Sequence, residues 1–406
     1  MHSLLYYVKL IARFGFMGYL LTLCKYTNQI NHLSLSHNNS NKHFIKHTAM
    51  KKRIRIKDIA AQAGVSSGTV DRILHNRGNV SEKARIAVEK VLKQMGYKPN
   101  IHLSGLSLKK TYEIVITTPH ASHGEYWESI HNGIQEAIDQ HESLNIKTTY
   151  LTYDQYNIYS CQNVFTQILI LEPDAVIIGP TFKDETTDLA NKLSEKKIPF
   201  TFVDSMVEGT SPLAFYSANH YILGYLMCKL LKSLIPESSD IGVLQAIRIG
   251  DQSANTSILR RKGTYDYLTE TNFSNEIHNI QFSVYEAQKN EEKMKEFFSS
   301  HSNVKGVIVL NSRGNVVANF LEQNLINDVK LVCVDLTKPN ITALKDGRIN
   351  FLIDQNPDYQ GYMAMKTLLE FLILQTKPKI ENYLPLNIVT KETIDLQLEF
   401  NFLKKI

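Results

Sequence analysis

The sequence predicts a protein of two unlike parts, a small all-α helix-turn-helix head followed by a larger two-lobed α/β core with parallel sheets. Three observations carry this prediction: helical periodicity broken by a glycine, separation of charge between the two parts, and strands that alternate with helices through the last 296 residues. The expected organisation is an extension at 1–49, the head at 50–97, a hinge at 98–110, the core at 111–395 and a tail at 396–406.

The extension differs in composition from the rest of the chain. Residues 1–49 contain no acidic residue and five histidines, and SHNNSNKHF is a polar stretch that is not typical of a folded domain. Residues 4–24 are apolar enough to suggest a membrane segment or signal peptide, but Lys9 and Arg13 interrupt them and no clear cleavage site follows. Since Met50 directly precedes KKRIRIKDIA, a start site assigned too early is the preferred explanation, and a membrane tether is the alternative.

The head is predicted to contain three short helices. Gly64 ends the first helix with a residue that tolerates a left-handed backbone, and Ser66 stands where an N-cap would open the second. Ser81 is the expected N-cap of the third helix, which Gly96 ends. The apolar residues at helical spacing, which we expect in a shared core, are Ile56, Ile59, Ala60, Ala63, Val70, Ile73, Leu74, Ala84, Ala87, Val88, Val91 and Leu92.

Charge separates the head from the core. Residues 50–110 carry fourteen Lys and Arg against four Asp and Glu, whereas residues 111–406 carry 26 basic against 36 acidic residues. A segregated positive surface is typical of phosphate binding, with an affinity that falls steeply as salt rises. The head is therefore expected to bind DNA.

The segment AGVSSGTVDRILHNRGNVSEKARIAVEKVLKQMGYKPN, residues 63–100, closely resembles the head of the LacI family of bacterial transcription regulators. The resemblance implies a homodimer, or a higher assembly, whose second helices enter successive major grooves of a palindromic operator. By matching positions, Ser67, Gly68 and Arg72 would face base edges. The residues expected near the phosphate backbone are Ser66, Thr69, Asn76 and Val80.

Two departures from the family pattern shift the expected DNA readout onto Arg72. Gly68 has no side chain with which to read a base, and Asp71 places a carboxylate where the family usually has a small hydroxyl group. Arg72 can hold guanine O6 and N7 together, and Ser67 can assist it. The alternative for Arg72 is a phosphate contact or an interaction within its own helix.

The hinge IHLSGLSLKK, residues 101–110, occupies the place where the family carries a short helix with a leucine wedged between base steps. Leu106 matches that leucine, which would kink the duplex from the minor groove. Leu103 replaces a small residue, and Gly105 lowers the stability of a helix by roughly 1 kcal/mol relative to alanine. The alternative is a plain linker that is disordered away from DNA.

Strand candidates in the core alternate with helical stretches, as in parallel sheets covered on both faces. In such sheets ligands bind beyond the carboxyl ends of the strands, so polar residues that follow strands are the place to look. The candidate strands are EIVITTP (113–119), DAVIIGP (174–180), PFTFVDS (199–205), IGVLQAI (241–247), VKGVIVLN (304–311) and VKLVCVD (329–335).

Residues 111–395 resemble the sugar-binding core, of the periplasmic-binding-protein type I, that the LacI family attaches to its head. At matching positions Asp335 and Gln355 would hold sugar hydroxyls, because a carboxylate and an amide together supply acceptors and a donor. The alternatives are a helix N-cap or loop anchor for Asp335 and an interlobe contact for Gln355. Further effector-binding candidates are Tyr126 and Trp127, as aromatics that stack on a sugar face, and Asn255, Arg260, Asn311 and Arg313 in strand-end loops.

Other chemistry is not indicated by the sequence. His120 and His123 form an H-x-x-H pattern without a third ligand at a known spacing, so neither a metal nor a cofactor is expected. The four cysteines lie far apart and form no C-x-x-C pair, as in proteins of a reducing cytoplasm. No defensible nucleophile and base are present, and catalysis is not expected.

The sequence therefore predicts a cytoplasmic transcription regulator controlled by a small-molecule effector, a sugar or sugar derivative by resemblance. Whether it represses or activates is left open by the sequence. Two alternative functions remain open: a membrane-tethered sugar receptor, and a constitutive DNA binder whose core only dimerises.

Overall fold

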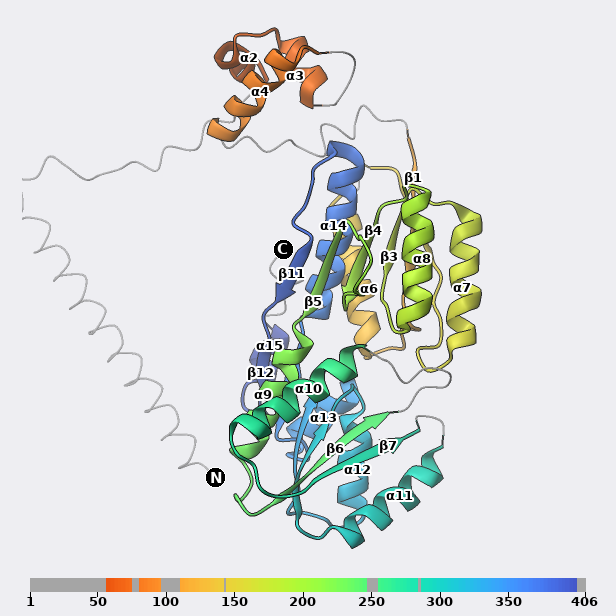
Figure 1. The fold of residues 1–406 in the computed structure, drawn as a ribbon, viewed down its shortest axis with the longest axis vertical. Coiled ribbons are helices and arrows are strands. Elements are labelled where there is room, and N and C mark those ends of the chain that lie inside the picture. The colour runs from red at the N-terminus through yellow and green to blue at the C-terminus, as the bar shows by residue number, and fades with distance from the viewer. Residues whose placement is uncertain are drawn as a thin grey trace, which may run out of the picture.

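The computed structural model describes residues 56–74, 80–95, 110–141, 144–246, 255–283 and 286–399, apart from the side chains of Asn255 and Ala287. The head contains α2 (Ile56–Ala63), α3 (Ser67–Leu74) and α4 (Glu82–Met95), as Figure 1 shows. Gly64 has a φ of 66°, and the Ser66 hydroxyl accepts a hydrogen bond from the Thr69 amide at 3.1 Å. Both predictions about the turn are therefore confirmed. Ile59, Ala60, Val70, Ile73, Val88 and Val91 are buried together, whereas Ala84 and Ala87 are half-buried.

The first lobe is a six-stranded sheet covered by helices on both faces (Figure 1). Its strands are β1 (Tyr112–Thr117), β2 (Ile146–Tyr150), β3 (Ala175–Ile178), β4 (Phe200–Asp204), β5 (Ala214–Ala218) and β11 (Glu381–Leu384). One face packs on α6 (Tyr126–Asp139) and α14 (Pro357–Leu374), and the other on α7 (Ile158–Leu171) and α8 (Lys183–Glu195). Successive residues of the central strands point to opposite faces, so both are apolar.

The second lobe repeats this plan. Its strands are β6 (Asp240–Ala246), β7 (Ile277–Phe282), β8 (Val304–Val309), β9 (Lys330–Val334), β10 (Phe351–Asp354) and β12 (Asn387–Val389). One face packs on α9 (His220–Lys232) and α10 (Asn255–Glu270). The other packs on α11 (Ala287–Ser300), α12 (Gly314–Gln323), α13 (Lys338–Lys345) and α15 (Ile394–Glu399).

The two sheets have matching strand orders, β2-β1-β3-β4-β5-β11 and β7-β6-β8-β9-β10-β12. All pairs are parallel except β12, which runs antiparallel to β10. The chain passes between the lobes three times, from β5 to α9, from β10 to α14 and from β11 to β12. The predicted parallel α/β core and all six predicted strands are confirmed. Since the strand orders match, each strand of one lobe has an equivalent in the other.

In each lobe, one pair of helices crosses at glycines. A Cβ added at Gly133 of α6 would lie 1.8 Å from the Asp358 carbonyl oxygen, and one at Gly361 of α14 would lie 2.0 Å from that of Ile130. In the second lobe a Cβ at Gly224 of α9 would lie 1.8 Å from the carbonyl oxygen of Arg260 on α10. The missing side chains let these helix backbones touch, which fixes the positions of residues at the helix N-termini near the cleft.

The expected boundary between core and tail needs correction. It falls after residue 395, but α15 runs through this position, and buried Ile394 ties the helix to the core of the second lobe. The extension 1–49 and the hinge leucine Leu106 lie outside the described residues. Within the part of the chain that is described, no helix is both long and apolar enough to span a bilayer.

Candidate functional site: the head surface and the cleft between the lobes

The exposed start of α3 carries most of the residues predicted to contact DNA. Ser66, Ser67, Gly68 and Arg72 are exposed, and Thr69 is half-buried with its hydroxyl 2.9 Å from that of Ser66. The Arg72 Nε donates to the Gly68 carbonyl oxygen at 3.1 Å, so this guanidinium lies along its own helix. Half-buried Val80 packs against the head core, and Asn76 lies outside the described residues.

A small cavity, here called the inner cavity, lies between the lobes at the carboxyl ends of their strands. Its volume is about 60 Å³. Its lining comes from both lobes: Tyr126, Trp127, Gln155, Tyr156, Thr181, Asp204, Ala246, Thr256, Ser257, Arg260, Asn311, Ser312 and Asp335. Five of the predicted effector residues therefore meet there, Tyr126, Trp127, Arg260, Asn311 and Asp335.

Two aspartates occupy equivalent positions on opposite sides of the inner cavity. Asp204 ends β4 and Asp335 follows β9, its equivalent strand, and both have a φ of 72°. A left-handed backbone is uncommon outside glycine and is often found at functional sites. Both aspartates are buried, with exposed fractions of 8% and 4%. Each lobe thus presents one buried carboxyl group at the cleft.

A chain of hydrogen bonds, here called the hinge chain, joins the two aspartates. His220 Nε2 lies 2.7 Å from the Asp204 carbonyl oxygen, and Arg260 Nη2 lies 3.1 Å from both His220 Nδ1 and Gln355 Oε1. Gln355 Nε2 then donates to Asp335 Oδ1 at 2.6 Å. His220 and Gln355 stand where the chain crosses between the lobes. The hinge chain therefore connects the two sides of the cleft through two crossovers.

The hinge chain fixes the protonation of its histidine. Arginine can only donate, so His220 Nδ1 must accept and its proton must lie on Nε2, which donates to Asp204. Burial, followed by the positive charge of Arg260, lowers the pKa of His220 to about 3. The imidazole is therefore neutral at physiological pH.

The Asp335 carboxylate is held from two sides within the second lobe. Its Oδ1 accepts from Gln355 and its Oδ2 accepts from Ser312 Oγ at 2.6 Å. Burial raises the pKa of Asp335, while Arg260 and these hydrogen bonds lower it. The carbonyl oxygen accepts from Asn340 Nδ2, which also anchors the loop after β9. The side chain is thus a fixed acceptor at the cavity wall.

The aromatic wall belongs to the first lobe. The Tyr126 hydroxyl donates to Asp204 Oδ1 at 2.8 Å, and burial raises the pKa of this phenol well above its usual range. The Trp127 ring meets Tyr126 edge to face at 5.2 Å and lies against Gly179, where a Cβ would come within 2.6 Å of it. Trp127 is therefore both a core residue and a cavity residue.

Three predicted residues do not line the inner cavity. Gln355 is 1% exposed and lies beneath the cavity, where its side chain links Arg260 and Asp335 of the second lobe. Arg313 lies further out, and its Nη1 is 2.7 Å from Glu125 Oε1 of the first lobe. Asn255 is the first residue of α10, and its side chain lies outside the described part.

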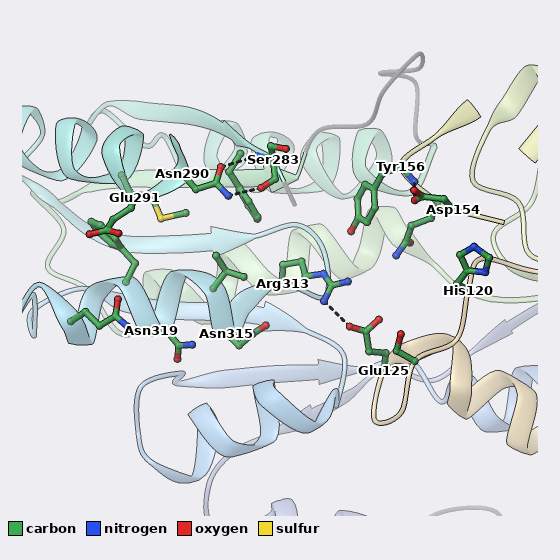
Figure 2. A pocket seen from close by; sticks show the side chains of 17 residues that line it. His120, Glu125, Asp154, Tyr156, Ser283, Asn290, Glu291, Arg313, Asn315 and Asn319 are labelled. Atoms are coloured by element: carbon green, nitrogen blue, oxygen red, sulfur yellow. Dashed lines mark hydrogen bonds and ion pairs between the residues drawn. The ribbon is translucent and has the colours of Figure 1, made fainter. Parts of the chain in front are cut away.

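A much larger hollow, here called the outer pocket, adjoins the inner cavity. Figure 2 shows the side chains that line the outer pocket. Its volume is about 620 Å³, and Gln155 and Tyr156 line both spaces. The Glu125–Arg313 ion pair crosses from one lobe to the other beside it, and Asn290 is hydrogen-bonded to Ser283 at the far end, as Figure 2 shows. The remaining lining residues are His120, Ser122, Asp154, Phe282, Glu291, Met294, Asn315, Val316, Asn319, Phe320 and Gln323.

One group of possible metal ligands lies away from the cleft, at the amino ends of β6 and β7. Ligand atoms of Asp240, Glu276 and His278 lie within 4.8 Å of one another. The Glu276 side chain is 79% exposed, and Asp240 Oδ1 already accepts from the Glu276 amide at 3.0 Å. We assign no metal to this group, because these contacts are accounted for by ordinary pairing within the strands. His123 of the H-x-x-H pattern contacts Glu128 instead.

Sequence reasoning missed Asp204, the strongest omission in the site. The signal was available, because PFTFVD ends in an aspartate just as VKLVCVD does, and the two strands are equivalent. His220 carried no such signal, since it begins a helix and reaches Asp204 and Arg260 only through the folded crossover.

Two family models match this chain. The model for the periplasmic binding protein domain matches residues 114–376, and that for bacterial regulatory proteins of the lacI family matches residues 55–100. A crystal structure of a LacI transcriptional regulator from Bacteroides fragilis superposes with a TM-score of 0.67 and 30% identity, covering 71% of this chain and 99% of that one. The chain belongs to the LacI family and carries a periplasmic binding protein domain.

Other known proteins match this chain over a smaller part of its length or share only its fold. Catabolite control protein A of Staphylococcus xylosus is 27% identical over 183 residues, 44% of this chain and 54% of that protein. The regulator DegA of Bacillus subtilis is 39% identical over 85 residues, 21% of this chain and 25% of DegA. The chain thus matches about half or less of the length of these relatives. The glucose-galactose binding protein GanP of Geobacillus stearothermophilus, 19% identical with a TM-score of 0.62 over 70% of this chain and 99% of GanP, shares the fold.

Proposed function

We propose that this protein is a cytoplasmic, sequence-specific DNA-binding transcription regulator whose affinity for its operator is controlled by a sugar or sugar derivative in the interlobe cleft. The observation that carries the proposal is the pair of buried aspartates, one from each lobe, joined by the hinge chain. A ligand that contacts both carboxyl groups prefers one arrangement of the lobes over others. Membership of the LacI family supports the DNA-binding half of the proposal.

The chemistry of the inner cavity suits polyhydroxyl ligands. Asp204 and Asp335 supply acceptors, Asn311 supplies both a donor and an acceptor, and Trp127 supplies an apolar face. The remaining lining residues, which include six with side-chain hydroxyls, fit the same ligand class.

Control of the head follows from coupling between two sites. The effector favours one arrangement of the lobes, the hinge 98–110 carries that preference to two heads of a homodimer, and operator DNA must favour or oppose the effector by the same factor. In this scheme the second helices read a palindromic operator, with Arg72 as the principal base contact. Ser66, Ser67, Gly68, Thr69 and Asn76 line the approach to DNA, and Leu106 inserts at the centre.

The direct test combines a ligand screen with an operator assay. The full chain is screened against sugars by thermal shift, and a bound effector should stabilise it by about 2.7 kcal/mol at a concentration near 100 Kd. The same compound should change the affinity for an operator selected from random DNA. Operator binding that no compound alters would favour a constitutive DNA binder instead.

For the head, we expect Arg72→Ala to cost about 1–3 kcal/mol at one operator base pair. The measurement is fluorescence anisotropy with a set of single-base operator variants. The matched control is Lys83→Ala, which removes one exposed positive charge from α4 and should weaken all sequences alike. A uniform loss for Arg72→Ala would reduce this residue to a phosphate contact.

A further inference from the structure

We propose that the outer pocket is a second sugar subsite of the same cleft, so that the effector is a neutral oligosaccharide rather than a single sugar. The inference rests on the proposed function, because it takes the cleft to be the effector site. It concerns what lies beyond the inner cavity, on the far side of the Glu125–Arg313 ion pair.

The two hollows adjoin each other. Gln155 and Tyr156 line both, and two pairs of consecutive residues divide between them: Glu125 and Arg313 line the outer pocket, while their neighbours Tyr126 and Ser312 line the inner cavity. A ligand that lies against Tyr126 and Ser312 therefore has its outward end beside the ion pair. The outer pocket begins where the inner cavity ends.

Size favours a ligand that extends into the outer pocket. Sites for small molecules usually enclose roughly 300–1,000 Å³. The inner cavity, at about 60 Å³, falls well below this range, whereas the outer pocket, at about 620 Å³, lies within it. In the arrangement of lobes seen here, most of the space for a ligand is thus in the outer pocket.

The lining of the outer pocket suits sugar hydroxyls and the apolar faces of sugar rings. Gln155 of the first lobe and Asn315, Asn319 and Gln323 of α12 are amides, which both donate and accept. The three amides of α12 are spaced four residues apart, so they share one face of the helix. Tyr156 and Phe320 add aromatic surface beside them.

The backbone position of Asn315, the first amide of this helix face, is fixed. Its Oδ1 is buried, and among the described residues it accepts no hydrogen bond. Its backbone amide is already bonded to Asn340 Oδ1 at 2.8 Å, which fixes this end of the helix. Replacing the Asn315 side chain therefore keeps the backbone contact that fixes the start of α12.

Charge selects a neutral ligand. The outer pocket is lined by the carboxyl groups of Glu125, Asp154 and Glu291 against one guanidinium, that of Arg313, which Glu125 already pairs. The inner cavity adds two aspartates against Arg260, whose guanidinium donates to Leu310, His220 and Gln355. Sugar phosphates and uronic acids would meet net negative charge at both positions. Neutral glycans would not be repelled by this charge.

The test is calorimetric titration of the full chain with matched neutral series, each containing a monosaccharide, its disaccharide and its trisaccharide. The series are xylose, glucose, mannose and galactose with their linear oligomers, and glucose 6-phosphate and galacturonic acid are the anionic probes. We expect one disaccharide or trisaccharide to bind at least tenfold more tightly than its monosaccharide. Equal affinity along every series, or tightest binding of an anionic probe, would overturn the inference and leave the proposed function standing.

Variants locate the second subsite. Asn315→Ala and Gln323→Ala should each weaken the oligosaccharide several-fold and leave the affinity of the monosaccharide unchanged. The matched control is Gln288→Ala, which removes an exposed amide from α11 that lines neither hollow. An equal loss for monosaccharide and oligosaccharide would place both ligands in one site and contradict the inference. Absence of binding by any saccharide would instead refute the sugar-effector part of the proposed function.

Discussion

The two lobes share a strand order, a helix crossing at glycines and a buried aspartate with the same backbone conformation, yet they hold that aspartate differently. The Asp204 carboxylate accepts a hydrogen bond from Tyr126 of its own lobe, and the backbone of Asp204 joins the hinge chain. Its carbonyl oxygen does so through His220, and its amide through Gln360, which donates to the Gln355 carbonyl oxygen. The Asp335 carboxylate is itself a link of that chain, through Gln355.

This difference gives the two lobes different parts in ligand binding and in passing the effect of the ligand to the crossovers. A ligand that replaces or shifts the hydrogen bonds of Asp335 acts on Gln355 and Arg260, which reach the crossovers. A ligand that contacts the Asp204 carboxylate leaves the carbonyl bond to His220 in place. We infer that the first lobe mainly supplies affinity and the second lobe supplies the signal.

The largest expected effect concerns the close helix crossings at glycines, which both lobes share. Gly224→Ala and Gly361→Ala each place a methyl group against a backbone carbonyl of the crossing helix, and each should lower the free energy of unfolding by about 1–3 kcal/mol or more. Denaturant unfolding measures both. The control is Gly68→Ala on α3, where a Cβ meets only Ser66 Oγ at 3.9 Å and should stabilise the helix by roughly 0.5–1 kcal/mol. A neutral result in one lobe would break the structural equivalence.

A second prediction uses the crossovers, one of which carries titratable His220 and the other Gln355. The folded pKa of His220 is about 3, below its usual value of 6.5. As the pH falls below 6.5, the unfolded chain binds a proton at His220 that the folded chain does not bind. The contribution of His220 to stability at neutral pH is therefore lost. Between about pH 7.5 and about pH 5 this loss is roughly 2 kcal/mol.

The measurement is the free energy of unfolding of the wild type and of His220→Gln across this pH range. The stability advantage of the wild type over the variant should shrink by about 2 kcal/mol toward the acid end. His123→Gln is the control, since the His123 side chain is 83% exposed. A pH-independent difference between wild type and His220→Gln would mean that His220 is not a buried neutral imidazole.

The smallest expected effect compares the hydroxyl donors of the two aspartates. Ser312→Ala and Tyr126→Phe each remove one hydrogen bond to a buried carboxylate, and each should destabilise the fold by about 1 kcal/mol. Thermal unfolding measures the two losses side by side. A loss at one aspartate alone would show that the carboxylates are not held by comparable contacts.

The sequence predicted the parts of the site that depend on local patterns. Apolar runs located the strands, and the rule that ligands lie beyond their carboxyl ends selected Asn311 and Arg260, which both line the inner cavity. Tyr126, Trp127 and Asp335, which also line the cavity, were selected by family resemblance. Asp204 could have been found by comparing the ends of equivalent strands.

The remaining contacts depend on the folded arrangement of the lobes. Glu125 and Arg313 are 188 residues apart in the sequence. Their ion pair could not be predicted from the sequence, because it depends on how the two lobes lie against each other. Gln355 was correctly expected at the end of a strand, but its side chain points to Arg260 and Asp335 because α9 and α10 cross closely at Gly224. Long-range packing therefore decided which strand-end residue faces the cavity and which lies beneath it.

The most direct test of the account compares Asp335→Ala with Asp204→Ala in operator binding at saturating effector. We predict that Asp335→Ala binds the operator as the wild type does without effector but loses the effector response, because its carboxylate is a link of the hinge chain. Asp204→Ala should need more effector and still respond in full. A normal response from Asp335→Ala, or loss of the response from Asp204→Ala alone, would contradict the account.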